Sequence, residues 1–326
     1  MAGEKLQIAV YDGVDTGKNW GENMRERWNQ DTVGFLYGFL GVVGFSLTLP
    51  VTRLAVESFS PTLVALGRAL AAAVLAAASL WIRREKWPSW QQIKSLAIVA
   101  LGVIVGFPLL SAWAMERLPA SHGAVVLALL PLVTAGAAAL RAGEYPSRRF
   151  WFASVAGSLT VLGYAFSRGL GTLQQADLAL LGAVVAAAIG YAEGGKLSRE
   201  LGGWQVIAWA LVLTAPFLVW PVAASVTPDV RTAPPIAWVS FAYLSLGSQF
   251  AAFVAWYTRL GIGGVARVSQ LQYLQPFLTI LWAAWLLGEA ITPVTIVACL
   301  IVVIVVALAR NAAVARKPLG KFNTKS

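Results

Sequence analysis

Long apolar runs separated by short polar segments occupy the chain from about residue 33 to residue 310. Each run is long enough for a helix, at 1.5 Å per residue, to cross a hydrocarbon core of about 30 Å. The runs are continuously apolar and lack the alternation of a membrane β-strand. The pattern therefore predicts ten transmembrane helices, at residues 33–52, 61–82, 95–115, 122–141, 149–168, 177–198, 204–226, 235–258, 265–287 and 293–310.

The composition supports this interpretation. Hydrophobic residues make up 58% of the chain and charged residues only 12%, with a mean hydropathy of +0.69. An average soluble domain is roughly 45–50% apolar and 25% charged. We therefore expect an all-α protein embedded in a lipid bilayer, and a soluble fold is excluded.

The net charge of +10 raises the question of a nucleic-acid partner, which the distribution of the charges answers. With the N-terminus inside, about 20 Lys and Arg residues fall on the cytoplasmic side and about 4 on the other. This asymmetry is the positive-inside pattern of membrane proteins, so no nucleic-acid partner is expected. It predicts cytoplasmic termini and, for a bacterial chain, the inner membrane.

An internal repeat relates the two halves of the chain. The segment LLPLVTAGAAALRAGE (129–144) aligns with LQPFLTILWAAWLLGE (274–289), which places Pro131 on Pro276 and Glu144 on Glu289. Three further matches lie upstream: Gly44 with Gly190, Phe45 with Tyr191, and Arg53 with Arg199. We expect two repeats, at 33–168 and 177–310, between a polar tail (1–32) and a basic tail (311–326).

Each repeat holds five predicted spans. Because five is odd, the two copies must enter the membrane in opposite directions, which makes the repeat inverted. Inverted repeats are typical of transporters in which each half opens the central site to one side of the membrane.

The paired motifs resemble a known family. The mid-helix proline followed by Gly-Glu, present twice, and SPTLVALGRALAAA (60–73) resemble the EamA module of the drug/metabolite transporter superfamily. Within it the chain is similar to YddG-type amino-acid exporters. The resemblance implies helices 1–4 and 6–9 around a central cavity, with helices 5 and 10 outside. The second copy departs from the pattern, because Leu211 stands near the equivalent of Arg68.

Pro131 and Pro276 are the candidate gates. A proline inside a helix removes one N–H donor and clashes with the carbonyl four residues back, which kinks the helix. The freed carbonyls could line a cavity and the kinks act as hinges. The alternative is a packing kink, because prolines are common in membrane helices.

Two polar stripes, one along the predicted span 235–258 and one along 265–287, are the candidate binding surface. Polar side chains facing lipid are costly, so each stripe either lines a wet cavity or joins helices. We expect Gln272 and Gln249 to hold the polar head of a substrate. The other candidates on or beside these stripes are Ser269, Ser245, Tyr273, Tyr243, Trp256 and Trp113, whose aromatic members would pack the side chain.

Charged and titratable residues inside predicted spans are few, and such residues are functional candidates. Arg68 either braces helices or binds a substrate carboxylate. Glu193 either carries substrate charge or pairs with Lys196, one turn away. His122 either titrates and couples protons or is a wetted interfacial residue.

The sequence favours a secondary transporter that exports amino acids, aromatic or otherwise neutral and hydrophobic, by alternating access. The alternatives are efflux of toxic or cationic molecules, a membrane-embedded enzyme, and a channel. No phosphate-binding loop, metal cluster or nucleophilic triad is visible, so we expect no enzymatic activity and no cofactor. The expected partners are a small-molecule substrate and the bilayer.

Overall fold

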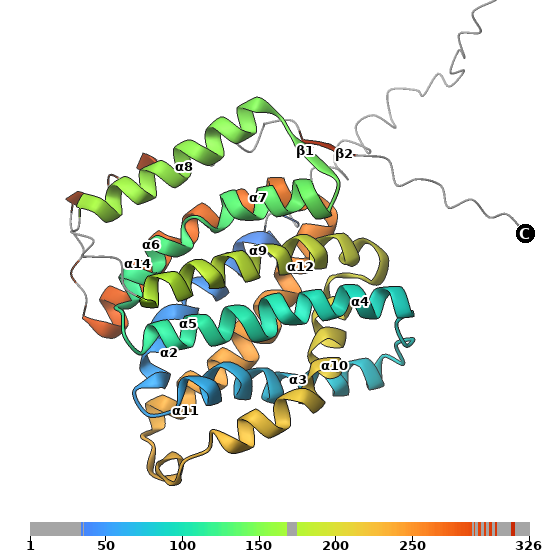
Figure 1. Cartoon of the computed structure of the whole chain (residues 1–326), viewed down its shortest axis with the longest axis vertical. Coiled ribbons are helices and arrows are strands. Elements are labelled where there is room, and N and C mark those ends of the chain that lie inside the picture. Colours follow the sequence, from blue (N-terminus) through green and yellow to red (C-terminus); the bar gives the residue numbers. More distant parts are fainter. Residues whose placement is uncertain are drawn as a thin grey trace, which may run out of the picture.

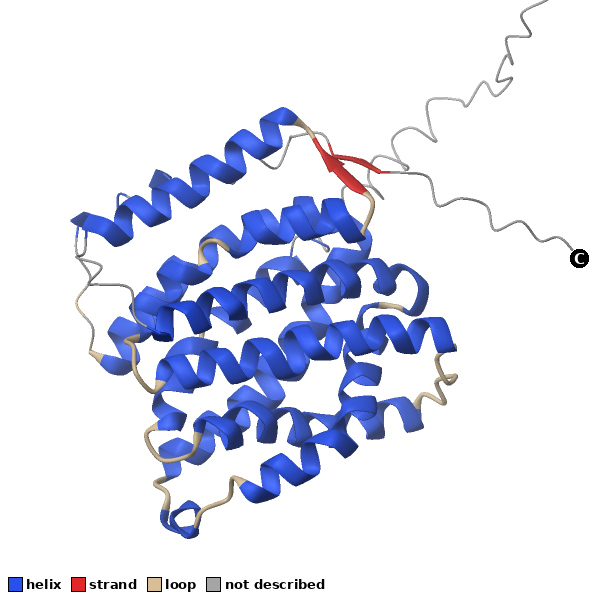
Figure 2. Ribbon diagram, viewed as in Figure 1, coloured by secondary structure: helices blue, strands red, loops and turns tan. Residues whose placement is uncertain are grey.

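The computed structural model describes residues 36–167 and 175–288 without a gap, together with residues 34, 290, 293, 294, 297, 300, 301, 304 and 314–316. The described part is almost entirely helical (Figure 2). Six of its helices are long and apolar enough to cross a membrane: Leu36–Val56, Leu63–Ile82, Trp90–Met115, Gln175–Leu201, Gly203–Ala224 and Pro235–Gly263. Most of the tenth predicted span, including Cys299, and the first 32 residues lie outside the described residues.

Six of the predicted spans are matched in position by these helices, and several of the helices are longer than predicted. The third begins at Trp90 rather than near residue 95, because Ser89 caps its first turn. The Ser89 hydroxyl accepts from the Gln92 amide, and the Gln92 side chain accepts from the Ser89 amide, which satisfies two otherwise free donors. Apolar length alone therefore underestimates a helix that continues past the hydrocarbon.

Helix α9 (Gln175–Leu201) lies in the middle of the bundle (Figure 1). It packs against α5 (Phe107–Met115), α7 (Leu130–Arg141) and α12 (Phe253–Gly263), and against α10 (Gly203–Ala224), which follows it in the chain. Its buried positions are mostly alanine and glycine, so neighbouring helices approach closely on several sides.

Helix α8 (Arg148–Ser167) lies at the edge of the bundle (Figure 1). It contacts α6 (Ala120–Leu127) and α7, while Phe152 on its outer side is 79% exposed. This is the position that the resemblance implied for the fifth helix.

The fourth and ninth predicted spans are each broken at the proline. The fourth divides into α6 and α7, with Pro131 in the first turn of α7. The ninth divides into α13 (Val265–Ser269), a 3₁₀ turn over Gln270–Leu274, and α14 (Gln275–Leu287), whose first turn holds Pro276. Proline suits a first helical turn, because the amide it lacks has no partner there. At each expected kink the α-helical hydrogen bonding is therefore interrupted, while the backbone keeps helical dihedral angles.

Three helices contain π-helical turns that the sequence did not indicate. They cover Leu63–Gly67 before α3 (Arg68–Ile82), Ala100–Gly106 between α4 (Trp90–Val99) and α5, and Tyr243–Ala252 between α11 (Pro235–Ala242) and α12. Such turns are rare in proteins, and those that occur are often found at functional sites. The second and third lie in the third and eighth predicted spans, which correspond in the repeat.

The remaining elements are short. Helix α2 (Thr48–Val56) completes the first span, and a 3₁₀ turn, Pro228–Thr232, precedes α11. The strands β1 (Glu144–Pro146) and β2 (Val314–Arg316) pair antiparallel and join the segment after α7 to the C-terminal tail. Apolar periodicity contained no signal for this pair.

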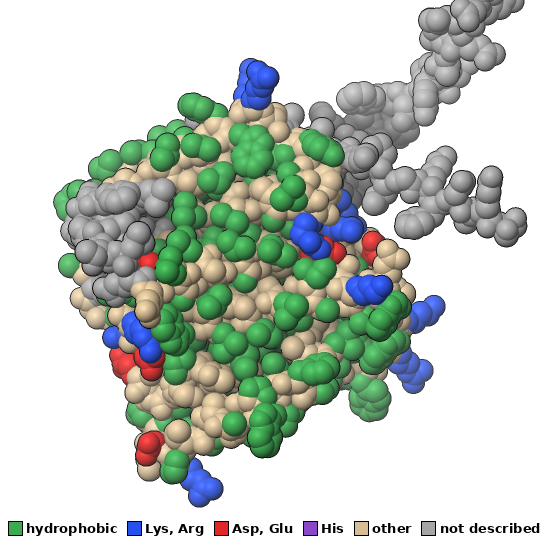
Figure 3. Space-filling model, viewed as in Figure 1, with side chains coloured by type: hydrophobic (Ala, Val, Ile, Leu, Met, Phe, Trp, Pro, Cys, Tyr) green, Lys and Arg blue, Asp and Glu red, His purple; other side chains and the backbone are tan. Residues whose placement is uncertain are grey.

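The surface is strongly apolar. In Figure 3, hydrophobic side chains cover the middle of the visible face, and most charged ones lie towards its two ends. Large outward side chains include Trp220 at 81% exposure and Phe217 at 79%. Such a surface suits a lipid environment, because exposed apolar patches of this extent are rare on soluble monomers.

Candidate functional site

Four aromatic side chains form a cluster inside the bundle: Phe45, Tyr191, Phe253 and Trp256. Ring centroids are 4.8 Å apart for Phe45 and Phe253, and 5.7 Å for Tyr191 and Trp256. Phe45 stacks on Tyr191 at 6.2 Å, with the ring planes 26° apart. These two residues are matched in the internal repeat, so corresponding positions of the two halves meet here. We call this group the central aromatic cluster.

Buried polar atoms without hydrogen-bond partners among the described residues lie on the eighth and ninth predicted spans. Gln249 is fully buried; its Nε2 donates to the Val103 carbonyl at 3.3 Å, while its Oε1 has no partner among the described residues. Neither amide atom of buried Gln272 forms a hydrogen bond of normal geometry there, and neither does Nε1 of Trp256. A buried polar group left unsatisfied costs about 1–3 kcal/mol. Gln272 lies close to Tyr191, although no bond between them has normal geometry, so the Oε1 of Gln249 and the Nε1 of Trp256 are the clearest unpaired groups here.

Arg68 belongs to the same region. It is the first residue of α3, immediately after the π-helical turn, and its side chain is buried, with 3% exposure. Electrostatically it interacts with Tyr191, which also lies beside Gln272. None of the ion pairs within the described ranges includes Arg68. Near the equivalent position of the second repeat the chain has Leu211, which carries no charge.

The eighth helix divides its polar stripe between two uses. The Ser248 hydroxyl bonds that of Thr48 at 2.8 Å, and the Tyr243 hydroxyl donates to the Gly44 carbonyl at 2.7 Å. Ser245 donates to the carbonyl of its own helix at Phe241. The first two bonds hold helices together, while Gln249 and Trp256 keep polar atoms without partners among the described residues. The binding role expected for Tyr243 and Ser245 stays a prediction.

The ninth helix also differs in part from the expectation. Tyr273 points towards α8, where its hydroxyl donates to the Ser154 carbonyl at 2.6 Å and its ring lies beside Gly157. Ser269 donates to the Ala266 carbonyl. A 3₁₀ turn has 3.0 residues per turn rather than 3.6, which places Gln272 and Tyr273 on different faces from those of a regular helix. Gln272 therefore remains the central candidate from this helix.

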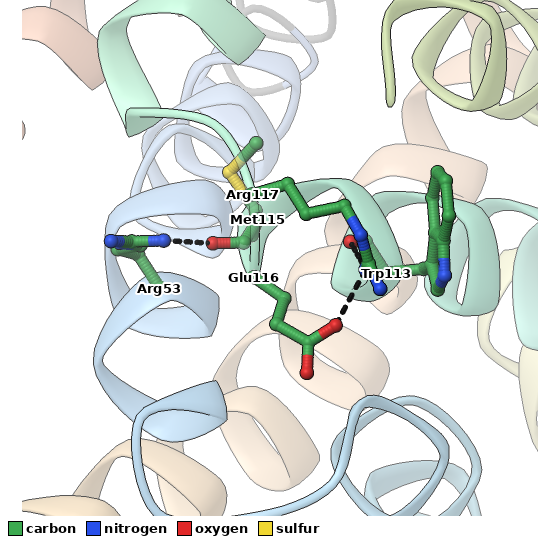
Figure 4. Close-up of polar contacts among 5 residues, drawn as sticks. All are labelled: Arg53, Trp113, Met115, Glu116 and Arg117. Atoms are coloured by element: carbon green, nitrogen blue, oxygen red, sulfur yellow. Dashed lines mark hydrogen bonds and ion pairs between the residues drawn. The ribbon is translucent and has the colours of Figure 1, made fainter. Parts of the chain in front are cut away.

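Trp113 lies at the end of α5, away from the aromatic cluster. Its ring lies under the Arg117 guanidinium, 4.0 Å from the ring centroid, and Arg117 also pairs with Glu116 (Figure 4). Nearby, the Arg53 Nη1 donates to the Met115 carbonyl at 2.6 Å (Figure 4). Trp113 therefore stacks against a cation in this structure, and the substrate-packing role expected for it stays a prediction.

Glu193 does not pair with Lys196. Its Oε2 accepts from the Arg141 Nε at 3.0 Å, and its Oε1 accepts from the Ser95 hydroxyl at 2.7 Å. Glu193 and Lys196 both line a polar pocket of about 200 Å³ between the start of α4 and the end of α9. The carboxylate therefore joins α4, α7 and α9 near one end of the bundle.

His122 pairs with Asp177, with 2.5 Å between Nε2 and Oδ1. The contact joins the first turn of α6 to the first turn of α9, and the His122 side chain is 22% exposed. In the ranges that the structure describes, no third His, Cys, Asp or Glu completes a metal site here. The two hypotheses for His122, that it couples protons or that it is a wetted interfacial residue, both remain predictions.

Three members of the central aromatic cluster were not among the predicted site residues: Phe45, Tyr191 and Phe253. Two of them carried a usable signal, because Phe45 and Tyr191 are matched in the internal repeat. Positions near an axis that relates two halves contact their own counterparts, as in a symmetric dimer. Phe253 carried no comparable signal, since aromatic residues are frequent throughout the spans.

Comparisons with known proteins agree with this architecture. The EamA-like transporter family matches residues 32–166 and again residues 174–310. A Bacillus subtilis protein named "Uncharacterized transporter YdeK" is 45% identical over 284 residues, covering 87% of this chain and 99% of that protein. A "Probable terminal-alkyne amino-acid exporter" from Streptantibioticus cattleyicolor is 24% identical, covering 79% of this chain and 86% of that one.

A solved structure, titled only "Crystal structure of protein", has the same fold. It superposes with a TM-score of 0.69 at 18% sequence identity, over 85% of this chain and 97% of that chain. The twofold family match spans both halves, and a relative with 45% identity is matched over nearly its whole length. The chain therefore belongs to the EamA-like transporter family.

Proposed function

We propose that this transporter exports amino acids with aromatic or other apolar side chains, and that it works by alternating access of a central site. The observation that carries the proposal is a pair of buried amides on the eighth and ninth predicted spans: Gln249, whose Oε1 has no partner among the described residues, and Gln272, which lies beside Tyr191 of the central aromatic cluster. An amino acid needs both kinds of contact, because its head group is polar and its side chain is apolar.

The paired helix breaks support a rocking mechanism. Broken helices at corresponding positions of two repeats are typical of transporters whose binding site lies near the middle of the membrane. The breaks at Pro131 and Pro276 divide the fourth and ninth helices into segments that can reorient separately. In this proposal the two halves are inverted five-helix repeats, and the contact between Phe45 and Tyr191 lies near the axis that relates them.

The substrate class has two supports. One relative bears a name that states amino-acid export, and it covers most of this chain. The second support is the absence of an available carboxylate near the cluster in the described part of the chain, which disfavours efflux of cations. Glu193 was the candidate for that role, and both of its oxygens already accept hydrogen bonds from Arg141 and Ser95.

Substitutions at Gln272 and Trp256 test the site. We expect Gln272→Ala and Trp256→Ala each to lower the initial rate of phenylalanine counterflow in proteoliposomes by about tenfold or more, the effect of losing about 1.4 kcal/mol of interaction. Both proteins should still be produced at normal levels. Gln91→Ala, which removes an exposed glutamine, is the matched control and should transport at the wild-type rate. Wild-type rates in both site variants would contradict the proposal.

We also propose that the protein lies in a bacterial inner membrane with both termini in the cytoplasm. The support is the excess of Lys and Arg on one set of loops. In a Cys299→Ser background, a membrane-impermeant maleimide should label Arg231→Cys in intact cells, and Lys86→Cys only after permeabilisation. Both positions are exposed in the structure. The reverse labelling pattern would overturn this orientation.

A further inference from the structure

The guanidinium of Arg68 is an uncompensated positive charge in the interior. Its side chain is 3% exposed, its Nε has no hydrogen-bond partner among the described residues, and the group with which it interacts electrostatically is Tyr191, not a carboxylate. The acidic side chains that form ion pairs in the described part of the chain have partners other than Arg68: Glu116 pairs with Arg117, Glu144 with Arg199, Asp177 with His122, and Glu193 with Arg141.

This arrangement differs from that of the other buried charges. An arginine cannot lose its proton in a protein, so burial cannot neutralise it as it can a lysine. A buried ion without a partner costs several kcal/mol, and charged groups in membrane helices are found paired or facing a solute pathway. Buried Glu144 and Glu193 follow that rule, because each binds an arginine. Arg68 satisfies it only when an anion reaches the central site.

We propose that Arg68, which like Gln272 lies beside Tyr191, binds the carboxylate of the transported molecule. Because the carboxylates with ion pairs in the described part of the chain are all engaged by other residues, we also propose that an α-amino group is not required for binding. The inference rests on the proposed function and narrows its substrate class to apolar carboxylates. Aromatic and aliphatic acids without an amino group then bind the same site as the amino acids do.

The local chemistry fits one carboxylate. A guanidinium presents parallel N–H donors that match the two oxygens of a carboxylate, and such charge-assisted bonds are about twice as strong as neutral ones. The Gln272 amide supplies a further donor. The aromatic rings of Phe45 and Trp256 provide the apolar surface for the remainder of the molecule. Because the second repeat has Leu211 near the equivalent position, the site holds one such cation and therefore one anionic group.

A ligand series tests the proposal on the unmodified protein. Phenylalanine, hydrocinnamate and phenethylamine share one aromatic side chain; the second lacks the amino group, and the third lacks the carboxylate. The readouts are competition against phenylalanine counterflow in proteoliposomes and the thermal stability of the purified protein in detergent. We expect phenylalanine and hydrocinnamate to compete and to stabilise, and phenethylamine to do neither at tenfold higher concentration.

Variants assign the effect to Arg68. In Arg68→Gln, the concentration of hydrocinnamate that gives half of the stabilisation should rise about tenfold or more, as expected for the loss of a charge-assisted hydrogen bond. Arg68→Lys keeps the charge but not the planar fork, so it should be intermediate. Arg231→Gln removes an exposed arginine and should match the wild type.

The outcomes separate this inference from the proposed function. If phenethylamine competes as well as phenylalanine, the protein is a transporter but carboxylate recognition is wrong. If no compound is transported but hydrocinnamate stabilises the wild type and not Arg68→Gln, the carboxylate site stands and the proposed transport fails. Equal stabilisation by chloride and by hydrocinnamate would identify a general anion site and overturn the inference, as would wild-type behaviour of Arg68→Gln in the ligand series.

Discussion

Replacing Glu144 with alanine is expected to lower the free energy of unfolding by about 3–5 kcal/mol, because it leaves a partly buried arginine without its counter-ion. Glu144 is fully buried, and its Oε1 accepts from the Arg199 Nη2 at 2.7 Å. Titration with a denaturing detergent, or thermal unfolding of the purified protein, measures the loss.

The same carboxylate caps a helix from another part of the chain. Its Oε1 accepts from the Val265 amide at 3.0 Å, and its Oε2 from the Ala266 amide at 2.7 Å. These are the first amides of the broken ninth helix, which have no partner within the helix, and a negative charge is favourable at that end. Glu144 therefore joins the segment after α7 to the start of α13 and to the end of α9.

Two further variants show whether the loss comes from the pair. Glu200→Ala removes an exposed carboxylate at the end of α9 and should change stability by less than about 0.5 kcal/mol. In Glu144→Gln with Arg199→Met, neither charge remains, so part of the loss should be recovered. A double variant that is no more stable than Glu144→Ala would show that the unpaired charge of Arg199 is not the main cause of the loss.

Replacing Gly102 with valine is expected to destabilise the protein by about 3 kcal/mol, at the upper end of the usual effect of overpacking. A β-carbon at this position would lie 2.5 Å from the Ala186 carbonyl oxygen and 2.9 Å from the Gly190 Cα. Both are backbone atoms of α9, so the two helices must move apart. The measurement is thermal unfolding in detergent, together with the yield of monodisperse protein.

Gly136 in α7 is the matched control for this variant. A β-carbon there meets no atom within 4 Å, so Gly136→Ala should keep or slightly raise stability, since alanine favours a helix. If Gly102→Val unfolds at the same temperature as the wild type, the close contact between the third and sixth helices is not required for the fold.

The helix breaks illustrate how far a local pattern predicts the fold. A proline in an apolar run indicates an interruption, and both interruptions occur at Pro131 and Pro276. The 3₁₀ turn before Pro276 was not indicated, because its conformation is set by packing around the break. That turn decides that Gln272 stays near Tyr191 while Tyr273 turns to α8.

The partners of charged side chains, in contrast, could not be predicted from local sequence spacing. Glu193 and Lys196 are one turn apart, which made a local pair reasonable, but Glu193 pairs with Arg141, 52 residues away. Likewise, Arg199 reaches Glu144 across 55 residues. Long side chains select partners in three dimensions, and sequence spacing reports only those on the same helix.

The sequence by itself determined the membrane class, the positions of the six spans that the described residues confirm, the repeat and the family. Each follows from the length and order of apolar runs and from motifs that occur twice. The tertiary structure decided which polar atoms join helices and which remain unpaired inside, as the bonded Ser248 hydroxyl and the Oε1 of Gln249 show on adjacent positions. The physical reason is that hydrophobicity acts residue by residue along the chain, whereas a hydrogen bond requires two groups that only folding brings together.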